Sequence, residues 1–409
     1  MQEELEKLIK YNETNVLNLL EKLDESEKEK ILEQVSKIDF ELLEDLYKRI
    51  GKEEVKEETK IEPIDFVDKE KLSENEIFEL EQIGIDEIKQ GKFAVITMAG
   101  GQGTRLGHNG PKGTYEFDIE NHKSIFEVLC ENFKRAYDKY SVYVQWYIMT
   151  SVENNKDTVE FFEKNNYFGY PKDKITFFIQ GQMPMIDKDG KLIIDENRQI
   201  KMASDGHGGI FKIVQENGII QDMKDKGIEW IYMGGVDNVL SKLIDPLFIG
   251  VAVKEKVLAA GKSVVKAYPE EKIGVFCTKN GKPSVVEYIE LSKEMSEETN
   301  ENGELKFGEG HILCNLFNIK AIDMTREENL PYHTQYKKCN YIDMDGNTVI
   351  ATEPNAYKFE SFLFDVFEKL DKMAILRVKR EEEFAPIKNA EGVDSPETAR
   401  KLYKDYWNK

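Results

Sequence analysis

The stretch FAVITMAGGQGTRLGHNGPKG, residues 93–113, carries the strongest structural signal in the chain. Residues 93–98 are apolar or β-branched and predict a buried strand. Gly100, Gly101, Gly103 and Gly107 follow, and Pro111 and Lys112 close the loop, which we call the glycine loop (residues 99–113). Backbone N–H groups can approach an anion closely where glycine removes the Cβ, and Arg105 adds a second cation beside Lys112. The stretch therefore predicts a loop that holds a polyphosphate.

The glycine loop matches neither of two well-known phosphate-binding motifs. A Walker A loop ends in Gly-Lys-Ser/Thr, whereas Lys112 follows a proline. A dinucleotide fingerprint needs G-x-G-x-x-G, whereas Gly101, Gly103 and Gly107 have the spacing G-x-G-x-x-x-G. A purely structural turn would need neither four glycines nor two cations. We therefore expect a phosphate loop of another family.

The whole loop fits the pattern A-G-G-x-G-T-R-L-G-x-x-x-P-K, which is the signature of the nucleotide-sugar pyrophosphorylases. In this spacing the chain resembles the eukaryotic-type UDP-N-acetylhexosamine and UDP-glucose pyrophosphorylases, through most of its length from Phe93 onward. The resemblance implies that UTP and a sugar 1-phosphate react to a UDP-sugar and pyrophosphate. It implies nucleotide binding by Ala99, Gly100, Gly101, Gly103 and Thr104, and catalytic roles for Arg105 and Lys112.

Composition and charge narrow the class of protein further. The 409 residues carry a formal net charge of −21, which argues against nucleic acids and anionic membranes as partners. The four cysteines lack C-x-x-C spacing, no apolar run reaches about 18 residues, and the N-terminus lacks the apolar core of a signal peptide. We expect a cytoplasmic enzyme with reduced thiols, either a monomer or a weak oligomer.

Strand and helix signals alternate after the glycine loop, which predicts βαβ units. We expect an α/β fold with a Rossmann-like, mostly parallel mixed sheet flanked by helices, and ligands beyond the carboxyl ends of the strands. The expected strands are 142–149, 175–179, 230–233, 263–267, 274–277 and 284–288, and the expected helices are 124–140, 156–165, 209–217, 358–372 and 396–407.

Three consecutive regions are expected along the chain. Residues 1–90 have helical spacing of apolar residues and contain no cluster of nucleophiles, bases or metal ligands. They predict an N-terminal helical appendage that packs or binds a partner. Residues 91–380 are expected to form the nucleotidyltransferase domain, and residues 381–409 a C-terminal segment with a terminal helix.

Nucleotidyl transfer brings two anions together, so it depends on cations and alignment more than on a general base. Asp237 follows a buried strand and two glycines, which predicts a carboxylate for Mg²⁺ that bridges phosphate oxygens. An Asp-Asn turn is the alternative. Residues 380–390 resemble the family pattern R-E-x-E-F-x-P-x-K-N-A, which implies that Lys388 is a second phosphate-side lysine. Its acidic neighbours leave a solvated surface lysine as the alternative.

Two segments resemble the family's uracil-reading segments, QGQMP at 180–184 and KMASDGHGG at 201–209. By this resemblance Gln180, Met202 and Gly206 would line the base, and an amide such as Gln180 can pair with the uracil edge. His207 stands where the hexosamine enzymes usually carry Asn and the glucose enzymes carry His. We expect it to contact substrate as a hydrogen-bond donor.

The expected sugar-binding residues also come from the resemblance. Glu287, in VEYIE, can accept hydrogen bonds from two sugar hydroxyls, and Tyr288 matches the family as well. His311 stands where the family usually has Asn, and Asn315 is a second candidate nearby. Lys358, in EPNAYKFESFLFD, would reach the ligand. Most motifs favour a hexosamine substrate, whereas His207 favours glucose.

Two other functions remain open, a UDP-sugar-dependent glycosyltransferase and a non-catalytic nucleotide-sugar binder. The tripeptide Asp343, Met344, Asp345 has the D-x-D form of a glycosyltransferase metal motif. However, Asp345 and Gly346 lie between two β-prone runs, which favours a hairpin turn. The glycine loop with its two cations favours the pyrophosphorylase function.

Overall fold

The computed structural model describes residues 1–51, 59–119, 122–325, 330–343 and 345–407. They form two compact units, each discontinuous in sequence. The first unit is Met1–Glu58, Gly181–Ile210 and Leu330–Leu363, and the second is Thr59–Gln180, Phe211–Asn329 and Phe364–Lys409. These units differ from the three consecutive regions expected from the sequence, because two internal segments fold with the N-terminal helices and residues 59–90 fold with the second unit.

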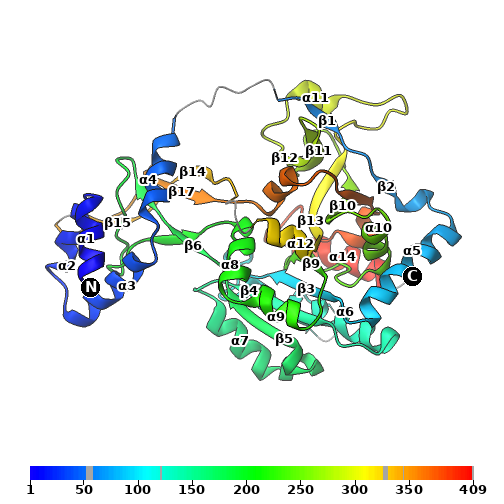
Figure 1. The fold of residues 1–409 in the computed structure, drawn as a ribbon, viewed down its shortest axis with the longest axis horizontal. Helices are drawn as coiled ribbons and strands as arrows, with labels where there is room; N and C mark the ends of the chain where they lie inside the picture. The colour runs from blue at the N-terminus through cyan, green and yellow to red at the C-terminus, as the bar shows by residue number, and fades with distance from the viewer. Residues whose placement is uncertain (52–58, 120–121, 326–329, 344, 408–409) are drawn as a thin grey trace. The chain divides into compact units, whose positions relative to one another are not determined.

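The second unit is built on a mixed sheet to which eleven of the described strands belong (Figure 1). They are β1 (Ile61–Pro63), β2 (Val67–Asp68), β3 (Phe93–Met98), β4 (Gln145–Thr150), β5 (Ile175–Ile179), β9 (Trp230–Gly235), β10 (Ala259–Val265), β11 (Val275–Lys279), β12 (Lys282–Val286), β13 (Glu309–Asn318) and β18 (Ala374–Arg377). The order along the main path is β2-β18-β10-β13-β9-β3-β4-β5. Along this path most neighbours are parallel, and β13 is antiparallel to both β9 and β10. The strands off the path, β1, β11 and β12, pair antiparallel. The mostly parallel mixed sheet expected from the sequence is confirmed.

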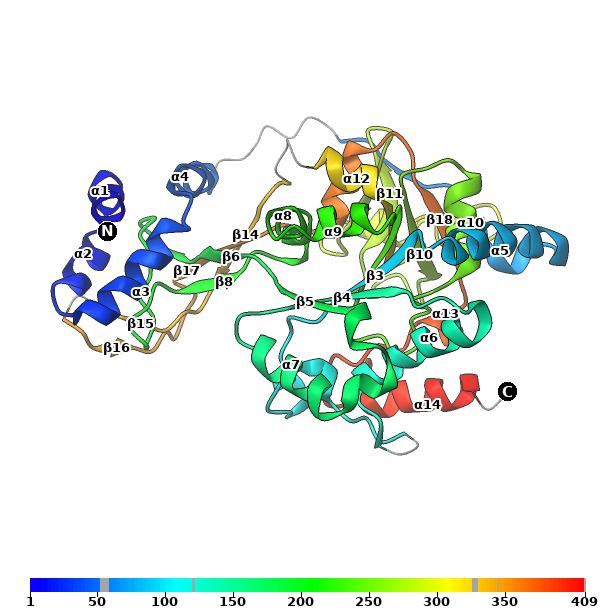
Figure 2. The same cartoon turned by 60° about the horizontal axis from the view of Figure 1, so that its bottom comes forward.

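Helices lie on both faces of this sheet (Figure 2). The described α-helices after residue 59 are α5 (Glu74–Lys89), α6 (Ile125–Tyr140), α7 (Asn155–Lys164), α8 (Ile210–Glu216), α9 (Ile219–Asp225), α10 (Pro246–Lys254), α11 (Lys293–Glu297), α12 (Ile319–Met324), α13 (Arg380–Glu383) and α14 (Pro396–Trp407). In β4, Trp146 stacks on Phe133 of α6 with ring centroids 4.6 Å apart. The next residue, Tyr147, donates its hydroxyl to Asp222 of α9 at 2.7 Å. Successive strand residues face opposite sides, so α6 and α9 cover opposite faces.

Residues 59–90 belong to the second unit because α5 packs closely on α10. A Cβ added to Gly84 would lie 2.0 Å from the carbonyl oxygen of Pro246, and one added to Gly250 would lie 1.9 Å from that of Leu80. Both contacts are with backbone, so only glycine permits this approach of the two helices. The pair is part of the large core that also contains the buried faces of α6 and α14.

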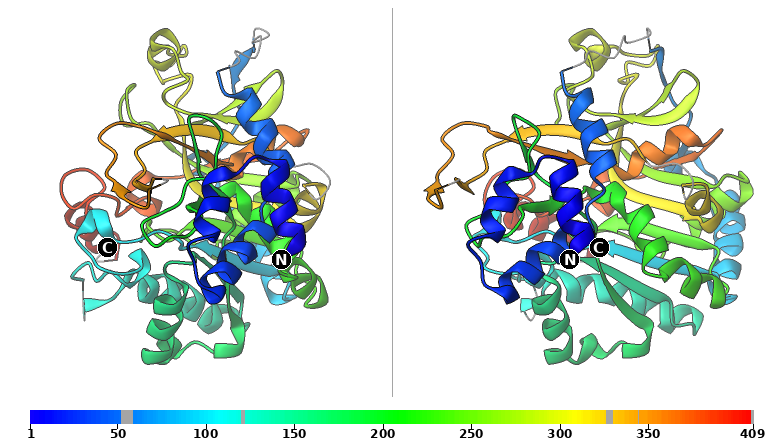
Figure 3. Two further views of the ribbon diagram at one scale, coloured as in Figure 1. Left: turned by 90° about the vertical axis from the view of Figure 1, so that its left-hand side faces the viewer. Right: turned by 60° about the vertical axis from the view of Figure 1, so that its left-hand side comes forward.

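The first unit joins the N-terminal helices to later strands (Figure 3 shows the helices in blue). Its elements are α1 (Gln2–Lys10), α2 (Thr14–Leu20), α3 (Glu25–Ser36), α4 (Phe40–Arg49), β6 (Gln182–Pro184), β7 (Ile186–Asp187), β8 (Met202–Ser204), β14 (His333–Lys337), β15 (Tyr341–Ile342), β16 (Thr348–Val349) and β17 (Ala356–Glu360). Leu8, Ile31, Ile186 and Phe359 share one core. The carboxylate of buried Glu13 accepts the N–H of Leu192 at 3.0 Å, which fixes the helices to the segment that follows β7.

The helix expected over 358–372 is wrong in its first part. Residues 356–360 form β17, which pairs antiparallel with β14 and β7. A 3-10 helix over Leu363–Lys369 follows. Tyr357 and Phe359 alternate with charged residues, and pairing with the distant β14 overrides the helical spacing. The other expected elements are confirmed, although β4 begins three residues later and β10 four residues earlier than expected.

Asp343 and Asp345 lie in a hairpin turn, and Met344 lies outside the described residues. β15 and β16 pair antiparallel, and Oδ1 of Asp343 accepts the N–H groups of Asp345 and Asn347 at 3.0 and 2.8 Å. The carboxylate is therefore used by the turn, which confirms the hairpin interpretation. Within the described ranges, no helix is both long enough and apolar enough to cross a lipid bilayer.

Candidate active site

The glycine loop is closed by hydrogen bonds between its two ends. The N–H of Lys112 donates to the carbonyl of Gly101 at 3.0 Å, and the N–H of Gly103 donates to that of Gly110 at 2.9 Å. Gly107 has a φ of +68°, a left-handed conformation that favours glycine. The backbone of the loop therefore holds its own shape.

Among the residues that the structure describes, the two cations of the loop have no charged partner. Arg105 is exposed and Lys112 half-buried, and neither forms an ion pair or hydrogen bond through its side chain with another described residue. In a chain with a net charge of −21, two uncompensated cations on one short loop make a local positive site. An anion at this loop would gain charge-assisted hydrogen bonds.

Gln180 and Gly100, both expected to bind the nucleotide, lie in contact. A Cβ on Gly100 would lie 2.4 Å from Oε1 of Gln180, so this amide position requires glycine. The backbone N–H of Gln180 donates to the carbonyl of Thr150 at the end of β4, at 2.8 Å. The amide therefore lies beside the start of the glycine loop, at the carboxyl ends of β3 and β4.

Asn154 supports the same loop, and sequence reasoning missed it. Its fully buried side chain donates from Nδ2 to the carbonyl of Ala99 at 2.9 Å, and its Oδ1 accepts the N–H of Ser151 at 2.8 Å. The signal available in the sequence was a short, mostly polar run, Thr150 to Asn154, at the end of a buried strand. Polar residues at the carboxyl end of a strand in such a sheet lie where ligands bind.

Asp237 lies next to the glycine loop. The N–H of Val236 donates to the carbonyl of Met98, the last residue of β3, at 3.1 Å. The half-buried carboxylate of Asp237 has no hydrogen-bond or ion-pair partner among the described residues. A Cβ on Gly235 would lie 2.9 Å from Oδ1 of Asp237, so the absence of a side chain at Gly235 leaves room for the carboxylate.

Lys388 is brought to Asp237 by backbone hydrogen bonds. The N–H of Ile387 donates to the carbonyl of Asp237 at 2.9 Å. The ammonium of Lys388 lies 3.6 Å from Asp394, and its side chain is 45% exposed. Ile387 directly precedes Lys388. The second expected phosphate-side lysine therefore lies next to the segment that contacts the Asp237 loop (residues 236–240).

A bulge in β13 lies between His311 and Asn315, two of the expected sugar-binding residues. Gly261 of β10 pairs with Asn315, but Ser263 pairs with His311, so β13 contains two extra residues at this point. Leu313 within the bulge has a φ of +53°. Bulges of this kind redirect side chains next to active sites. Here Nε2 of His311 lies 3.1 Å from Oδ1 of Asn315.

The amide nitrogen of Asn315 is the unusual atom of this pair. Asn315 is completely buried, and its Nδ2 has no hydrogen-bond partner among the described residues. A buried donor without an acceptor costs about 1–3 kcal/mol, so this amide nitrogen is a candidate donor to a bound ligand or water. The bulge that creates this arrangement could not be seen in the sequence.

Glu287 and Tyr288 follow β12, as expected. Glu287 is half-buried and Tyr288 is 41% exposed. The backbone N–H of Glu287 donates to the carboxylate of Glu290 at 2.9 Å, which forms a turn after the strand. Their role in sugar binding stays a prediction.

Four of the predicted site residues lie in the first unit instead. Met202 packs against its core, and Lys358 forms an ion pair with Glu360 at 2.5 Å. A Cβ on Gly206 would lie 2.3 Å from the carbonyl oxygen of Ser361. Nδ1 of His207 accepts the N–H of Leu363 at 3.0 Å. The neutral imidazole therefore carries its proton on Nε2, and the expected contact of His207 with substrate stays a prediction.

A divalent cation fits the Asp237 carboxylate only together with ligand oxygens. The described residues contain no group of three or more His, Cys, Asp or Glu side chains that converge to hold a metal. A half-buried carboxylate without a partner is a suitable oxygen donor for a hard cation that keeps several non-protein ligands. Asp237 would then supply one ligand and substrate phosphates the others.

Comparison with known proteins decides the family. The model of the UTP–glucose-1-phosphate uridylyltransferase family matches residues 40–393, which is most of the chain. The chain belongs to this family. It is therefore a uridylyltransferase of the UDP-sugar pyrophosphorylase type, as the glycine loop predicts, and the glycosyltransferase alternative is not supported.

Individual UDP-sugar pyrophosphorylases match over most of this chain. The UDP-N-acetylglucosamine pyrophosphorylase of Saccharomyces cerevisiae is 41% identical over 81% of this chain and 71% of its own length. The UDP-N-acetylglucosamine diphosphorylase 2 of Arabidopsis thaliana is 34% identical over 97% and 82%. The crystal structure of the UDP-N-acetylglucosamine pyrophosphorylase of Trypanosoma brucei, solved with an inhibitor, superimposes with a TM-score of 0.83 at 30% identity, covering 97% of this chain and 83% of that one.

Proposed function

We propose that this uridylyltransferase uses UTP and N-acetylglucosamine 1-phosphate. The observation that carries the proposal is the junction of the glycine loop, the Asp237 loop and the Lys388 segment (residues 383–388) at the carboxyl ends of β3 and β9. This junction places uncompensated cations and a carboxylate at the edge where ligands of such sheets bind. The relatives named above are UDP-N-acetylglucosamine enzymes, which supports the choice of sugar.

In this proposal the side chains align two anions. Arg105 and Lys112 bind the phosphates that leave as pyrophosphate, and the amide of Gln180 pairs with the uracil edge. Lys388 lies on the side of the sugar phosphate. An oxygen of that phosphate forms a bond to the α-phosphorus of UTP while the bond from the α-phosphorus to the bridging oxygen breaks. Mg²⁺, held by Asp237 and phosphate oxygens, would neutralise charge on those oxygens when bound.

The sugar preference rests on Asn315. Its unpartnered buried Nδ2 is a donor for the acetamide carbonyl of an N-acetylhexosamine. Glucose 1-phosphate lacks that acceptor, so it leaves the donor unsatisfied.

Further contacts with the nucleotide or the sugar are proposed for Met202, Gly206, His207, Glu287, Tyr288, His311 and Lys358.

We also propose a cytoplasmic enzyme that is a monomer or a weak oligomer and binds neither nucleic acid nor membrane. All four cysteines are buried free thiols, which suits a reducing compartment. Burial raises the pKa of Cys130 and of Cys277 to about 12, so these thiols stay protonated and unreactive at neutral pH. Sedimentation of the purified chain tests the oligomeric state.

A pyrophosphate-release assay with a panel of sugars tests the proposed activity. The panel contains the 1-phosphates of N-acetylglucosamine, N-acetylgalactosamine, glucose and galactose, each with UTP and Mg²⁺. We expect the highest kcat/KM with N-acetylglucosamine 1-phosphate. A preference for glucose 1-phosphate would replace the proposed sugar, and no pyrophosphate with any sugar would leave a non-catalytic nucleotide-sugar binder.

A further inference from the structure

A buried lysine in the middle of the sheet lies between two carboxylates. Lys262 of β10 is fully buried, and its ammonium lies 2.6 Å from Oδ2 of Asp245 and 2.5 Å from Oε2 of Glu383. Glu383 is 1% exposed. Its second oxygen, Oε1, lies 3.3 Å from the ammonium of Lys242 and 3.6 Å from that of Lys69. The charges of Lys262, Asp245 and Glu383 thus form a cluster in the core, and those of Lys242 and Lys69 lie at its margin.

Stability alone does not explain this cluster. Burial by itself would lower the pKa of Lys262, but the carboxylates of Asp245 and Glu383 raise it above its usual value, so the lysine stays charged. The loss of water around each buried ion commonly outweighs the attraction between them, and apolar side chains of similar volume fill such a place as well or better. Because burying these ions costs free energy, the cluster is better explained by its effect on the backbone, which it holds in one position.

Glu383 begins the Lys388 segment, and this segment is bonded to the Asp237 loop along its length. Nδ2 of Asn238 donates to the carbonyl of Glu383 at 2.7 Å, and Oδ1 of Asn238 accepts the N–H of Ala385 at 2.8 Å. The N–H of Ile387 donates to the carbonyl of Asp237 at 2.9 Å. A shift of Glu383 would therefore move the segment and the loop together.

We propose that Lys262 and Glu383 are positioning residues for uridylyl transfer. Their ion pair fixes the Lys388 segment on β10, and the segment in turn fixes the Asp237 loop, so the pair sets the separation of the Asp237 carboxylate and the Lys388 ammonium. The inference rests on the proposed roles of Asp237 and Lys388. Lys262 and Glu383 themselves do not touch the reacting groups. They act on Asp237 and Lys388 through the hydrogen bonds described above.

Glu383→Gln tests the proposal, because it keeps the shape of the side chain and removes its charge. We expect kcat to fall at least tenfold while KM for UTP changes less than threefold, since the glycine loop is untouched. The amide protons of Ala385 and Ile387 should exchange with solvent at least tenfold faster, measured by hydrogen exchange on the peptide that contains them. The exchange readout does not depend on activity.

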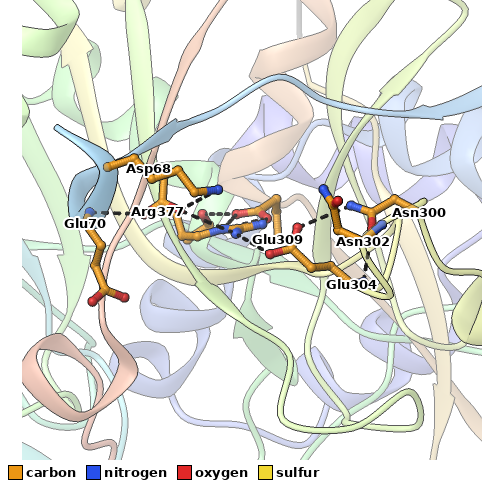
Figure 4. A network of polar contacts seen from close by, with 9 residues as sticks. Asp68, Glu70, Asn300, Asn302, Glu304, Glu309 and Arg377 are labelled. Carbon is orange, nitrogen blue, oxygen red and sulfur yellow. Dashed lines mark hydrogen bonds and ion pairs between the residues drawn. The ribbon is translucent and has the colours of Figure 1, made fainter.

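A second buried ion pair of the same sheet provides the matched control (Figure 4). Glu309, which is 4% exposed, binds the guanidinium of Arg377, with Nε 3.0 Å from Oε1, and accepts the hydroxyl of Ser263 at 2.6 Å. Among the described residues, this pair contacts Asp68 and Glu304 and not the Lys388 segment. Glu309→Gln should lower the melting temperature as Glu383→Gln does, but keep kcat within threefold and leave exchange at 385–387 unchanged.

The proposal is wrong if Glu383→Gln and Glu309→Gln behave alike in kcat and in exchange. Should Glu383→Gln fail to fold, Lys242→Met takes its place, because this lysine is partly exposed and, of the two Glu383 oxygens, pairs with Oε1. Its ammonium also lies 5.3 Å from the ring centroid of Tyr406, so methionine keeps an apolar contact with that ring. We expect the same two effects, at least threefold each, and their absence would equally overturn the proposal. Asp237→Asn and Lys388→Ala, assayed alongside, report separately on the proposed catalytic roles.

Discussion

The imidazole Nε2 of His108 lies 2.7 Å from the hydroxyl oxygen of Thr114, across the inside of the glycine loop. The hydroxyl of Thr114 donates its own proton to the carbonyl of Pro111 at 2.8 Å. His108 must therefore be the donor, with its proton on Nε2. A Cβ on Gly103 would lie 2.8 Å from the Cβ of His108, so the side chain packs directly under the glycines.

His108→Ala should loosen the phosphate loop. It removes one hydrogen bond and the packing under Gly103, which together are worth about 1 kcal/mol or more, so we expect KM for UTP to rise about fivefold or more with a smaller change in kcat. Steady-state kinetics with varied UTP measures it. His122→Ala, at an exposed position outside the loop, is the control. An unchanged KM for UTP would mean that the loop keeps its shape without His108.

Lys112→Ala should reduce kcat far more than it weakens UTP binding. The ammonium has no partner among the described residues, and its charge matters most when negative charge gathers on the leaving pyrophosphate. Initial rates and equilibrium binding of UTP separate the two effects. Lys164→Ala at the exposed end of α7 is the control. A kcat within about tenfold of the parent, roughly 1.4 kcal/mol in barrier, contradicts the assigned role.

Asp237→Asn should impair metal-dependent turnover and leave the fold intact. The carboxylate has no partner to lose among the described residues, so the substitution changes the charge without breaking a described contact. The measurement is initial rate against Mg²⁺ concentration, with Mn²⁺ as a possible substitute and circular dichroism as the folding control. Asp173→Asn, at an exposed position before β5, serves as the matched variant. If the Asp237→Asn variant keeps the parent's Mg²⁺ curve, Asp237 is only a turn residue.

Asn315→Leu should reduce the preference for N-acetylated sugars. The variant fills a similar volume but loses the buried donor, so kcat/KM for N-acetylglucosamine 1-phosphate should fall about tenfold or more. Glucose 1-phosphate should change less, because it has no acetamide to bind. Competition between the two sugar phosphates in one reaction gives the ratio directly. A parallel loss for both substrates would show that Asn315 does not read the acetamide.

Glu13→Gln should change the pH dependence of stability in the first unit. Burial raises the pKa of Glu13 to about 7, while the N–H of Leu192 and the charge of Lys191 lower it and Asp187 raises it. The folded state therefore binds this proton more tightly than the unfolded chain, whose glutamate has a pKa of 4.5. The free energy of unfolding should fall as pH rises from about 4.5 to 7, by roughly 3 kcal/mol in all, and then level off.

Glutamine can still accept the N–H of Leu192 and does not titrate, so Glu13→Gln should remove this fall. The variant should therefore be more stable than the parent at pH 8 and similar to it near pH 4.5. Thermal unfolding across this pH range, with hydrogen exchange at 187–194 to report on the first unit, measures the difference. Glu29→Gln, exposed on α3, is the control. Parallel curves for Glu13→Gln and the parent would contradict the assignment.

Local patterns were sufficient for the sheet and its phosphate loop. Residues 175–179 and 396–407 form the expected strand and helix without a shift, because each is defined by its own apolar spacing and its flanking prolines or glycines. Residues 356–360 were misread because their strand exists through β14, a partner that local spacing does not reveal. Glu383 lies in a run of acidic residues that normally indicates solvent, yet it is buried against Lys262. Only tertiary structure can show which member of such a run turns inward.

The first unit is assembled from stretches that lie far apart along the chain. Its N-terminal helices need the strands at 181–210 and 330–363 to complete their core. About 300 residues separate Met1–Glu58 from the end of the last stretch at Leu363. At a synthesis rate of about 5–20 residues per second, the helices emerge roughly 15 to 60 s before their final partner. During translation the apolar face of these helices therefore stays uncovered for that time, so this part of the chain is one that chaperones would need to protect while the protein is being made.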